Sequence, residues 1–113
     1  MTVTSVNLNY RPMQQHTYLT TTGPTSVFTV TQKGGYLTAL HFVNDDGSAA
    51  TMNIDFYDGS STFPLYDDQS VNGNHHLSLD LPAPFFVKSG QEIRITANHA
   101  NRIHVWGFGI IID

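Results

Sequence analysis

The segment that decides the fold is ATMNIDFYDG, residues 50–59. Its apolar side chains occupy every second position, at Ala50, Met52, Ile54 and Phe56. Successive side chains of a β-strand point to opposite faces of the sheet, so this period of two predicts a strand with one buried face. The aspartate and glycine at 58–59 then favour a tight turn, because both residue types tolerate a positive φ.

The rest of the chain repeats this pattern of short strands and turns. Alternating or wholly apolar runs lie at residues 6–10, 27–30, 36–43, 63–66, 77–81, 93–97 and 103–112. With residues 50–57 they make about eight strands, and no stretch has the 3.6-residue period of an amphipathic helix. We therefore predict an all-β protein, an antiparallel β-sandwich or small barrel with essentially no helix.

Prolines and polar residues indicate where the strands end. A proline has no N–H to donate to a sheet, so Pro12 is expected to stop the first run. For the same reason Pro82 and Pro84 are expected to stop the run at 77–81, and Pro64 to mark an edge strand. Residues 67–74 are expected to form a polar loop. The prediction is one domain over residues 1–113, with an N-terminal arm (1–12) and a sandwich body (13–113).

Composition excludes several classes of function. The 113 residues carry a net charge of −4 and only five scattered basic residues, so no surface for nucleic acid is predicted. No window approaches the ~18 apolar residues of a membrane span, and the N-terminus lacks an apolar signal segment, so no membrane partner is predicted. The absence of cysteine removes disulfides and thiolate chemistry.

Two runs are apolar on both faces. Residues 36–43 are expected to form a central strand covered on both sides, with Tyr36, Leu40 and Phe42 on one face. The last run, 103–112, must lie centrally in a sheet or have its outer face covered by another subunit. The arm is placed to reach a neighbour, so we predict an interface formed by Val6, Leu8, Tyr10, His104, Trp106, Phe108, Ile110 and Ile112. The alternative is that both segments are ordinary strands of a monomer.

The six histidines raise the question of a metal site. His75 and His76 are adjacent and would face opposite sides of a strand, whereas His99 and His104 could face each other across a turn, with Asp80 as a third ligand. No helical His-x-x-x-His or His-Glu pair is present, so we favour local hydrogen bonding and predict no metal. Histidines at an interface would make assembly sensitive to acid.

Neither the acidic clusters nor the sequence motifs indicate a calcium site or a catalytic site. The aspartates at 45–46 and 67–68 lack the spacing of a calcium loop, and a hairpin tip favours Asp and Gly for backbone reasons alone. The chain has no Gly-x-Ser-x-Gly elbow and no phosphate-binding loop. Glu92 and Asp80 could act as paired carboxylates only if folding brought them together across a cleft. We predict no enzyme activity and no cofactor.

Sugar binding is the main functional rival. Tyr57, Tyr66 and Trp106 lie on expected strands beside Asn and Asp residues. Aromatic faces stack on sugar rings while amides and carboxylates bond the hydroxyls. These three residues are the candidate sugar contacts, and the alternative for Trp106 is packing in the core or between subunits.

About three-quarters of the chain resembles a known group of proteins in its order of strands and turns. The matching segments are residues 26–30, 34–44, 50–59, 84–93 and 103–109. In this order they resemble the small all-β virion proteins of tailed bacteriophages, of the capsid decoration, cement and neck types. The resemblance implies a jelly-roll-like sandwich. The first ten residues lie outside the match, and the pattern does not require six histidines.

The resemblance also implies a function. It implies a non-enzymatic virion structural protein that decorates or cements a bacteriophage capsid, as a homo-oligomer, a trimer, in contact with the major capsid protein. The expected location is the capsid surface of the virion, after synthesis in the host cytoplasm. Two alternatives remain open: a carbohydrate-binding or receptor-binding module of a phage tail or neck fibre, and a subunit of a neck or tail connector.

Overall fold

The computed structural model describes residues 9–113 as eight antiparallel strands and no helix. The strands are β1 (Tyr10–Tyr18), β2 (Thr25–Thr29), β3 (Gly34–Asn44), β4 (Ala50–Tyr57), β5 (Thr62–Val71), β6 (His76–Lys88), β7 (Glu92–Ala97) and β8 (Ile103–Ile112). Over this range there is accordingly no helix that could cross a membrane. Val6 and Leu8 of the predicted interface, with the rest of the arm before Asn9, lie outside the described residues.

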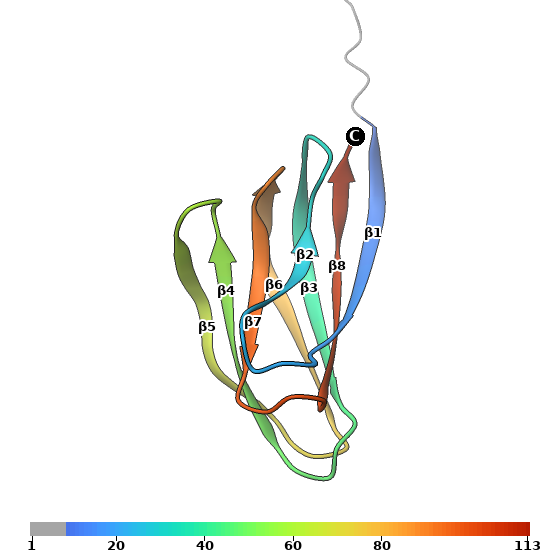
Figure 1. Cartoon of the computed structure of the whole chain (residues 1–113). Coiled ribbons are helices and arrows are strands. Elements are labelled where there is room, and N and C mark those ends of the chain that lie inside the picture. The colour runs from blue at the N-terminus through green and yellow to red at the C-terminus, as the bar shows by residue number, and fades with distance from the viewer. Residues whose placement is uncertain (1–8) are drawn as a thin grey trace, which may run out of the picture.

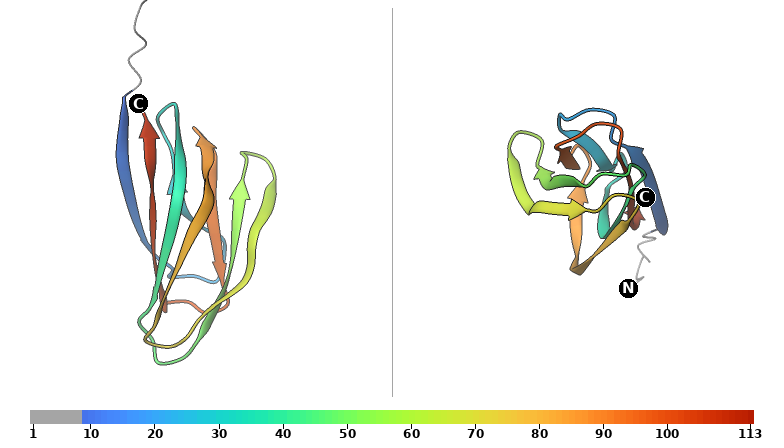
Figure 2. Two further views of the ribbon diagram at one scale, coloured as in Figure 1. Left: turned by 180° about the vertical axis from the view of Figure 1, so that it is seen from behind. Right: turned by 90° about the horizontal axis from the view of Figure 1, so that it is seen from below.

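The strands form two four-stranded sheets (Figures 1 and 2). Sheet A has the order β1-β8-β3-β6, and sheet B has the order β2-β7-β4-β5. Pairing is nested: β1 pairs with β8, β2 with β7, β3 with β6, and β4 with β5. The chain is thus one long hairpin rolled into two layers, which is the jelly-roll arrangement of a β-sandwich. The predicted fold class is confirmed.

Both sheets turn alternate side chains into one shared core. In β4, the alternation at Ala50, Met52 and Ile54 places all three side chains in the interior. In β8, the isoleucines and valine of one parity are buried, while the other parity faces outward. β8 lies between β1 and β3, which is the central position that the sequence offered as one of two explanations for this apolar run.

The prolines are the main place where the sequence-based strand ends are wrong. β1 runs through Pro12, and β6 runs through Pro82 and Pro84. Both are edge strands of sheet A. An edge strand pairs on one side only, so a proline whose nitrogen faces the other side removes no inter-strand hydrogen bond. Pro64 lies in β5, an edge of sheet B, as predicted. β1 therefore crosses the expected arm boundary at residue 12.

Two irregularities in the ladders explain the other differences. A β-bulge between residues 37 and 39 switches the parity of β3, so Tyr36 faces outward whereas Leu40 and Phe42 face the core. The double apolar pattern of 36–43 therefore comes from a bulge rather than from cover on both sides. The expected loop at 67–74 begins later, because β5 continues to Val71 past a positive φ at Asp68.

A glutamine side chain ties the two sheets together at one edge. The Gln15 amide donates from Nε2 to the Thr29 carbonyl at 2.8 Å, and its Oε1 accepts the Thr29 N–H at 2.9 Å. Gln15 is on β1 of sheet A and Thr29 is on β2 of sheet B. The Gln15 side chain therefore satisfies the N–H and the carbonyl of Thr29 on the edge strand β2.

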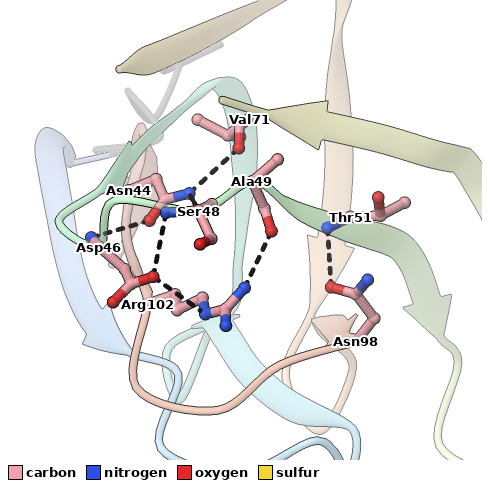
Figure 3. A network of polar contacts seen from close by, with 8 residues as sticks. All are labelled: Asn44, Asp46, Ser48, Ala49, Thr51, Val71, Asn98 and Arg102. Carbon is pink, nitrogen blue, oxygen red and sulfur yellow. Dashed lines mark hydrogen bonds and ion pairs between the residues drawn. The ribbon is translucent and has the colours of Figure 1, made fainter. Parts of the chain in front are cut away.

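The loops β3–β4, β5–β6 and β7–β8 gather at one end of the sandwich, which we call the loop end (Figure 1). Asn44, the one buried polar residue of the described chain, donates to the carbonyls of Ser48 and Val71 and accepts the Asp46 N–H. Arg102 donates to the Ala49 carbonyl and pairs with Asp46 at 3.4 Å (Figure 3). These contacts hold the β3–β4 loop beside the start of β8.

Candidate functional site

The outer faces of the two sheets differ in chemistry. In sheet B, outward positions of the central strands β4 and β7 carry Thr51, Asn53, Asp55, Glu92 and Arg94. A polar, charged outer face is the usual solvent side of an antiparallel sheet. In sheet A, the outward positions of β1, β8 and β3 carry aromatic, aliphatic, imidazole and uncharged polar side chains instead. The outer face of sheet A is therefore the candidate functional surface.

One half of this face is an apolar patch. We call it the apolar end, formed by Tyr10, Pro12, Tyr36, Phe86, Phe108, Ile110 and Ile112. Among residues 9–113, four of its members are in the group of five exposed large hydrophobic residues: Tyr10 (57%), Phe86 (39%), Ile110 (39%) and Phe108 (36%). Contiguous exposed apolar surface marks interaction sites in soluble proteins.

The other half, next to the loop end, carries histidines. Register places His16, Trp106 and His41 in one row across β1, β8 and β3, and His104 one row further toward the loop end. His16 stacks on Trp106 with ring centroids 4.6 Å apart, and Tyr18 stacks on His104 at 4.2 Å. We call this group the histidine end: His16, Tyr18, His41, His76, His104 and Trp106.

Three side chains of this region form a hydrogen-bonded chain. His16 Nε2 lies 2.9 Å from His104 Nδ1, and His104 Nε2 lies 3.1 Å from Asp45 Oδ2. Asp45 comes from the β3–β4 loop, which Asn44 and Arg102 hold in place. Burial raises the pKa of the nearby Tyr18 phenol, and the carboxylates of the same loop raise it further.

A shallow depression lies on the same face, where β3 and β6 separate. Leu37 pairs with Phe85 and Ala39 pairs with Asp80. Residues 81–84 of β6 therefore lie unpaired opposite the single residue Thr38. The depression has a volume of about 450 Å³ and is lined by Ala39, Leu40, His41, Ser78, Asp80 and Phe108. His41 Nδ1 is bonded to Ser78 Oγ at 2.7 Å.

The acidic clusters and histidines do not converge on an ion. Asp46 accepts the Ser48 N–H and pairs with Arg102, and Asp45 contacts His104, so these carboxylates have protein partners. Within residues 9–113, no three His, Asp or Glu side chains are arranged to hold a metal ion. His99, weighed with His104 as a ligand pair, is exposed in the β7–β8 turn, whereas His104 is hydrogen-bonded to His16 and Asp45.

The three candidate sugar contacts are not brought together. Tyr57 lies on the outer face of sheet B, where the Arg94 guanidinium covers its ring at 3.6 Å from the centroid. Tyr66, on β5, packs against the core. Trp106 lies on the outer face of sheet A. One chain therefore does not form the predicted aromatic patch, because the residues belong to opposite layers of the sandwich.

The predicted interface residues of β8 do share one surface. His104, Trp106, Phe108, Ile110 and Ile112 all point outward from sheet A, and Tyr10 pairs beside Ile112. Sequence reasoning missed Tyr18, His16, His41, His76, Tyr36 and Phe86 as their neighbours. A sequence period identifies the faces of one strand, but only the pairing register shows which residues of other strands lie alongside.

Comparisons with known proteins show the fold and no family. No protein-family model and no characterised protein sequence matches the chain. A chain of the Helicobacter pylori bacteriophage KHP30 capsid has a TM-score of 0.55 at 8% identity, over 89% of this chain and 86% of that chain. A Bacillus endospore appendage chain, from disulfide-linked pili, has a TM-score of 0.53 at 13% identity, over 97% and 93%.

A chain of the infectious bursal disease virus particle is also similar. Its TM-score is 0.53 at 7% identity over 97% of this chain, but the match spans only 32% of the viral chain. The protein thus corresponds to about a third of that larger capsid chain. At these identities the likeness is one of fold: the jelly roll is shared by viral shells and by a bacterial surface fibre.

Proposed function

We propose that the protein is a non-enzymatic structural component of a virion that decorates or cements a bacteriophage capsid. The observation that carries this role is the outer face of sheet A, which is apolar, aromatic and almost free of charge. The charged residues at its outward paired positions are Asp80 and Lys88, both on the edge strand β6. Arg11, which is paired with Asp113, borders the apolar end, and Asp45 contacts the histidine end. A chain that acts through an extended face rather than an enclosed site suits passive stabilisation of a shell.

The sheet edges support contact through the face. Three of the four edge strands contain proline: Pro12 in β1, Pro64 in β5, and Pro82 with Pro84 in β6. The fourth, β2, is short and has backbone groups occupied by the Gln15 side chain. Proline and covered edges prevent strand addition between molecules. Binding by this chain is therefore expected to bury the outer face of sheet A.

The proposed partners are further copies of the chain and the major capsid protein. The proposed oligomer is a trimer on the capsid surface, as the resemblance to phage decoration proteins implies. The KHP30 capsid chain supports a virion role because the match covers most of both chains, so that chain is of similar size. The endospore appendage chain supports the broader point that this fold serves in extracellular assemblies.

The direct test is the protein composition of purified virions from the virus that encodes the chain. Quantitative mass spectrometry should find the chain at a fixed ratio to the shell subunit, and electron microscopy should place it on the outer surface. Removal of the chain should lower the temperature at which particles release their nucleic acid. Absence of the chain from purified particles contradicts the proposal, and a tail or neck position favours the connector alternative.

The depression on sheet A favours saccharide binding as a second candidate. The Phe108 ring forms one wall, and Asp80 and Ser78 supply hydrogen-bonding groups for hydroxyls. A glycan array and sugar-induced shifts of the melting temperature test this function. Binding that Asp80→Asn abolishes would favour the receptor-binding alternative; no binding to any glycan would remove it.

A further inference from the structure

The four histidines of the histidine end come from four different strands. His16 is on β1, His104 on β8, His41 on β3 and His76 on β6. The rings of His41 and His76 have centroids 5.5 Å apart, and His41 lies 6.1 Å from Trp106. Only the other two histidines, His75 and His99, lie away from this surface, in loops. Imidazoles are thus concentrated on the face proposed for contact.

The hydrogen-bonded chain fixes which protons these rings can hold. The Asp45 carboxylate can only accept, so the His104 nitrogen that faces it, Nε2, carries a proton. In a neutral His104, Nδ1 then accepts, and the donor is the Nε2–H of His16. One added proton leaves this hydrogen bond intact. A second added proton would place the Nε2–H of His16 against the Nδ1–H of His104 across 2.9 Å. The two histidines therefore cannot both be charged in this geometry.

Few negative groups face these rings. Asp45, from the β3–β4 loop, contacts His104, whereas the neighbouring Asp46 is paired with Arg102. On β1 the group facing His104 is the Tyr18 phenol, and Trp106 of β8 faces His16.

Beside β3, the groups from β6 are Ser78 and His76, with Asp80 further along the strand. Protonation of His41, of His76 and of one member of the His16–His104 pair would therefore make this part of the face positively charged.

The size and charge of the whole face suit a second copy of the chain. Four strands spaced ~4.8 Å apart, with about ten residues each at ~3.3 Å, give a face of roughly 600 Å². Each partner in a stable protein interface contributes about 800 Å², which this face and its protruding side chains approach. With neutral histidines, Asp80 and Lys88 balance each other, and the remaining charge is the Asp45 carboxylate, which lies 3.1 Å from His104 Nε2. A face with so little charge lets two copies meet with little repulsion.

We infer that the outer face of sheet A, with the histidine end inside the contact, packs against a second copy of this chain while its imidazoles are neutral, and that this contact is lost when they become protonated. The inference rests on the proposed structural role. Burying a charged imidazole costs desolvation, and two copies would bring like charges together. Association is therefore strongest while the imidazoles are neutral and weakens as the pH falls and they become charged.

The test is the self-association constant of the full chain at pH 7.5 and pH 5.0. Sedimentation equilibrium or light scattering should show a Kd at least tenfold higher at pH 5.0, with circular dichroism confirming that the fold is retained. The double variant His16→Gln/His104→Gln should reduce this pH ratio to less than half. His99→Gln, in the exposed β7–β8 turn, is the matched control and should keep the wild-type ratio.

Three results would overturn the inference: a monomer at pH 7.5, an oligomer with the same Kd at both pH values, or a double variant with the wild-type pH ratio. If the first pair of substitutions prevents folding, His41→Gln/His76→Gln tests the same surface. Virion composition separates this outcome from failure of the proposed function, because the chain can be present in particles without self-association in solution.

Discussion

Gly109 lies in β8 at a point where no side chain fits. A Cβ built there would lie 2.2 Å from the Tyr36 carbonyl oxygen and 3.0 Å from the Phe28 ring. Backbone and a buried ring cannot both give way, so Gly109→Ala should lower the free energy of unfolding by about 3 kcal/mol or prevent folding. Chemical denaturation measures this change.

Gly47 provides the control for that substitution. A Cβ there would meet no atom within 4 Å, and its φ is not in the left-handed region. Gly47→Ala should change the free energy of unfolding by no more than about 0.5 kcal/mol. Equal effects of the two substitutions would contradict the close packing of β8 on β2.

Asp58 controls the β4–β5 turn through hydrogen bonds that depend on its charge. Its Oδ1 accepts the N–H groups of Ser60 and Ser61 at 2.9 and 2.7 Å, and these bonds lower the pKa of the carboxyl. A carboxyl with a lowered folded-state pKa stabilises the fold above its ordinary range near pH 4, and this contribution is lost as the pH falls through the folded-state value.

Asp58→Ala should therefore lower the melting temperature at pH 7, with the difference from wild type shrinking as the pH falls through the folded-state pKa, which lies below the ordinary one. Asp58→Asn keeps an acceptor oxygen and should lose less. Thermal melts between pH 2.5 and 7 give both curves. A penalty for Asp58→Ala that stays constant over this range would mean that the carboxylate charge contributes nothing to the turn.

At the scale of the strands, the Gln15 side chain joins β1 to β2 by two hydrogen bonds. Gln15→Ala should lower the free energy of unfolding by about 1 kcal/mol, since each exposed bond contributes about half of that. It should also increase the hydrogen-exchange rate of the Thr29 amide about tenfold. Gln14→Ala, next in the chain and facing outward, should change neither quantity. An unchanged hydrogen-exchange rate of the Thr29 amide in Gln15→Ala would show that the two Gln15 hydrogen bonds do not protect β2.

The strands themselves are largely predictable, and the errors have physical causes. Alternation identifies β4, β7 and β8 because each has one parity buried in the same core. Pro12 and Pro82 mislead because a proline ends a central strand but not an edge strand, and edge position is a property of the whole sheet. The β3 bulge misleads because one extra residue reverses every later side chain.

The candidate site is only partly predictable for a related reason. The outward residues of β8 can be read from its own sequence, with Trp106 and Phe108 on one parity. His16 and His41 reach the same surface through pairing with β8, across 65 or more positions of sequence. A local sequence pattern cannot predict which residues of other strands lie beside β8. Their positions depend on the nested strand pairing of the jelly roll.

At the scale of the whole molecule, the contrast between the outer faces of the two sheets predicts where assembly occurs. Phe108, in the middle of the sheet A face, is 36% exposed and points away from the core, so its replacement should leave the core packing unchanged. Phe108→Lys should leave the melting temperature within about 3 °C of wild type while weakening self-association at pH 7.5 at least tenfold, because a desolvated ammonium group would enter the contact.

Thr51→Lys places the same charge on the outer face of sheet B and should leave both quantities at their wild-type values. Light scattering at matched concentrations measures self-association, and differential scanning calorimetry measures the melting temperature. Association that Thr51→Lys weakens and Phe108→Lys does not would place the contact on sheet B. The apolar surface of sheet A would then need another occupant, such as the shell itself, since exposed aromatic and aliphatic groups at this density favour burial in some partner.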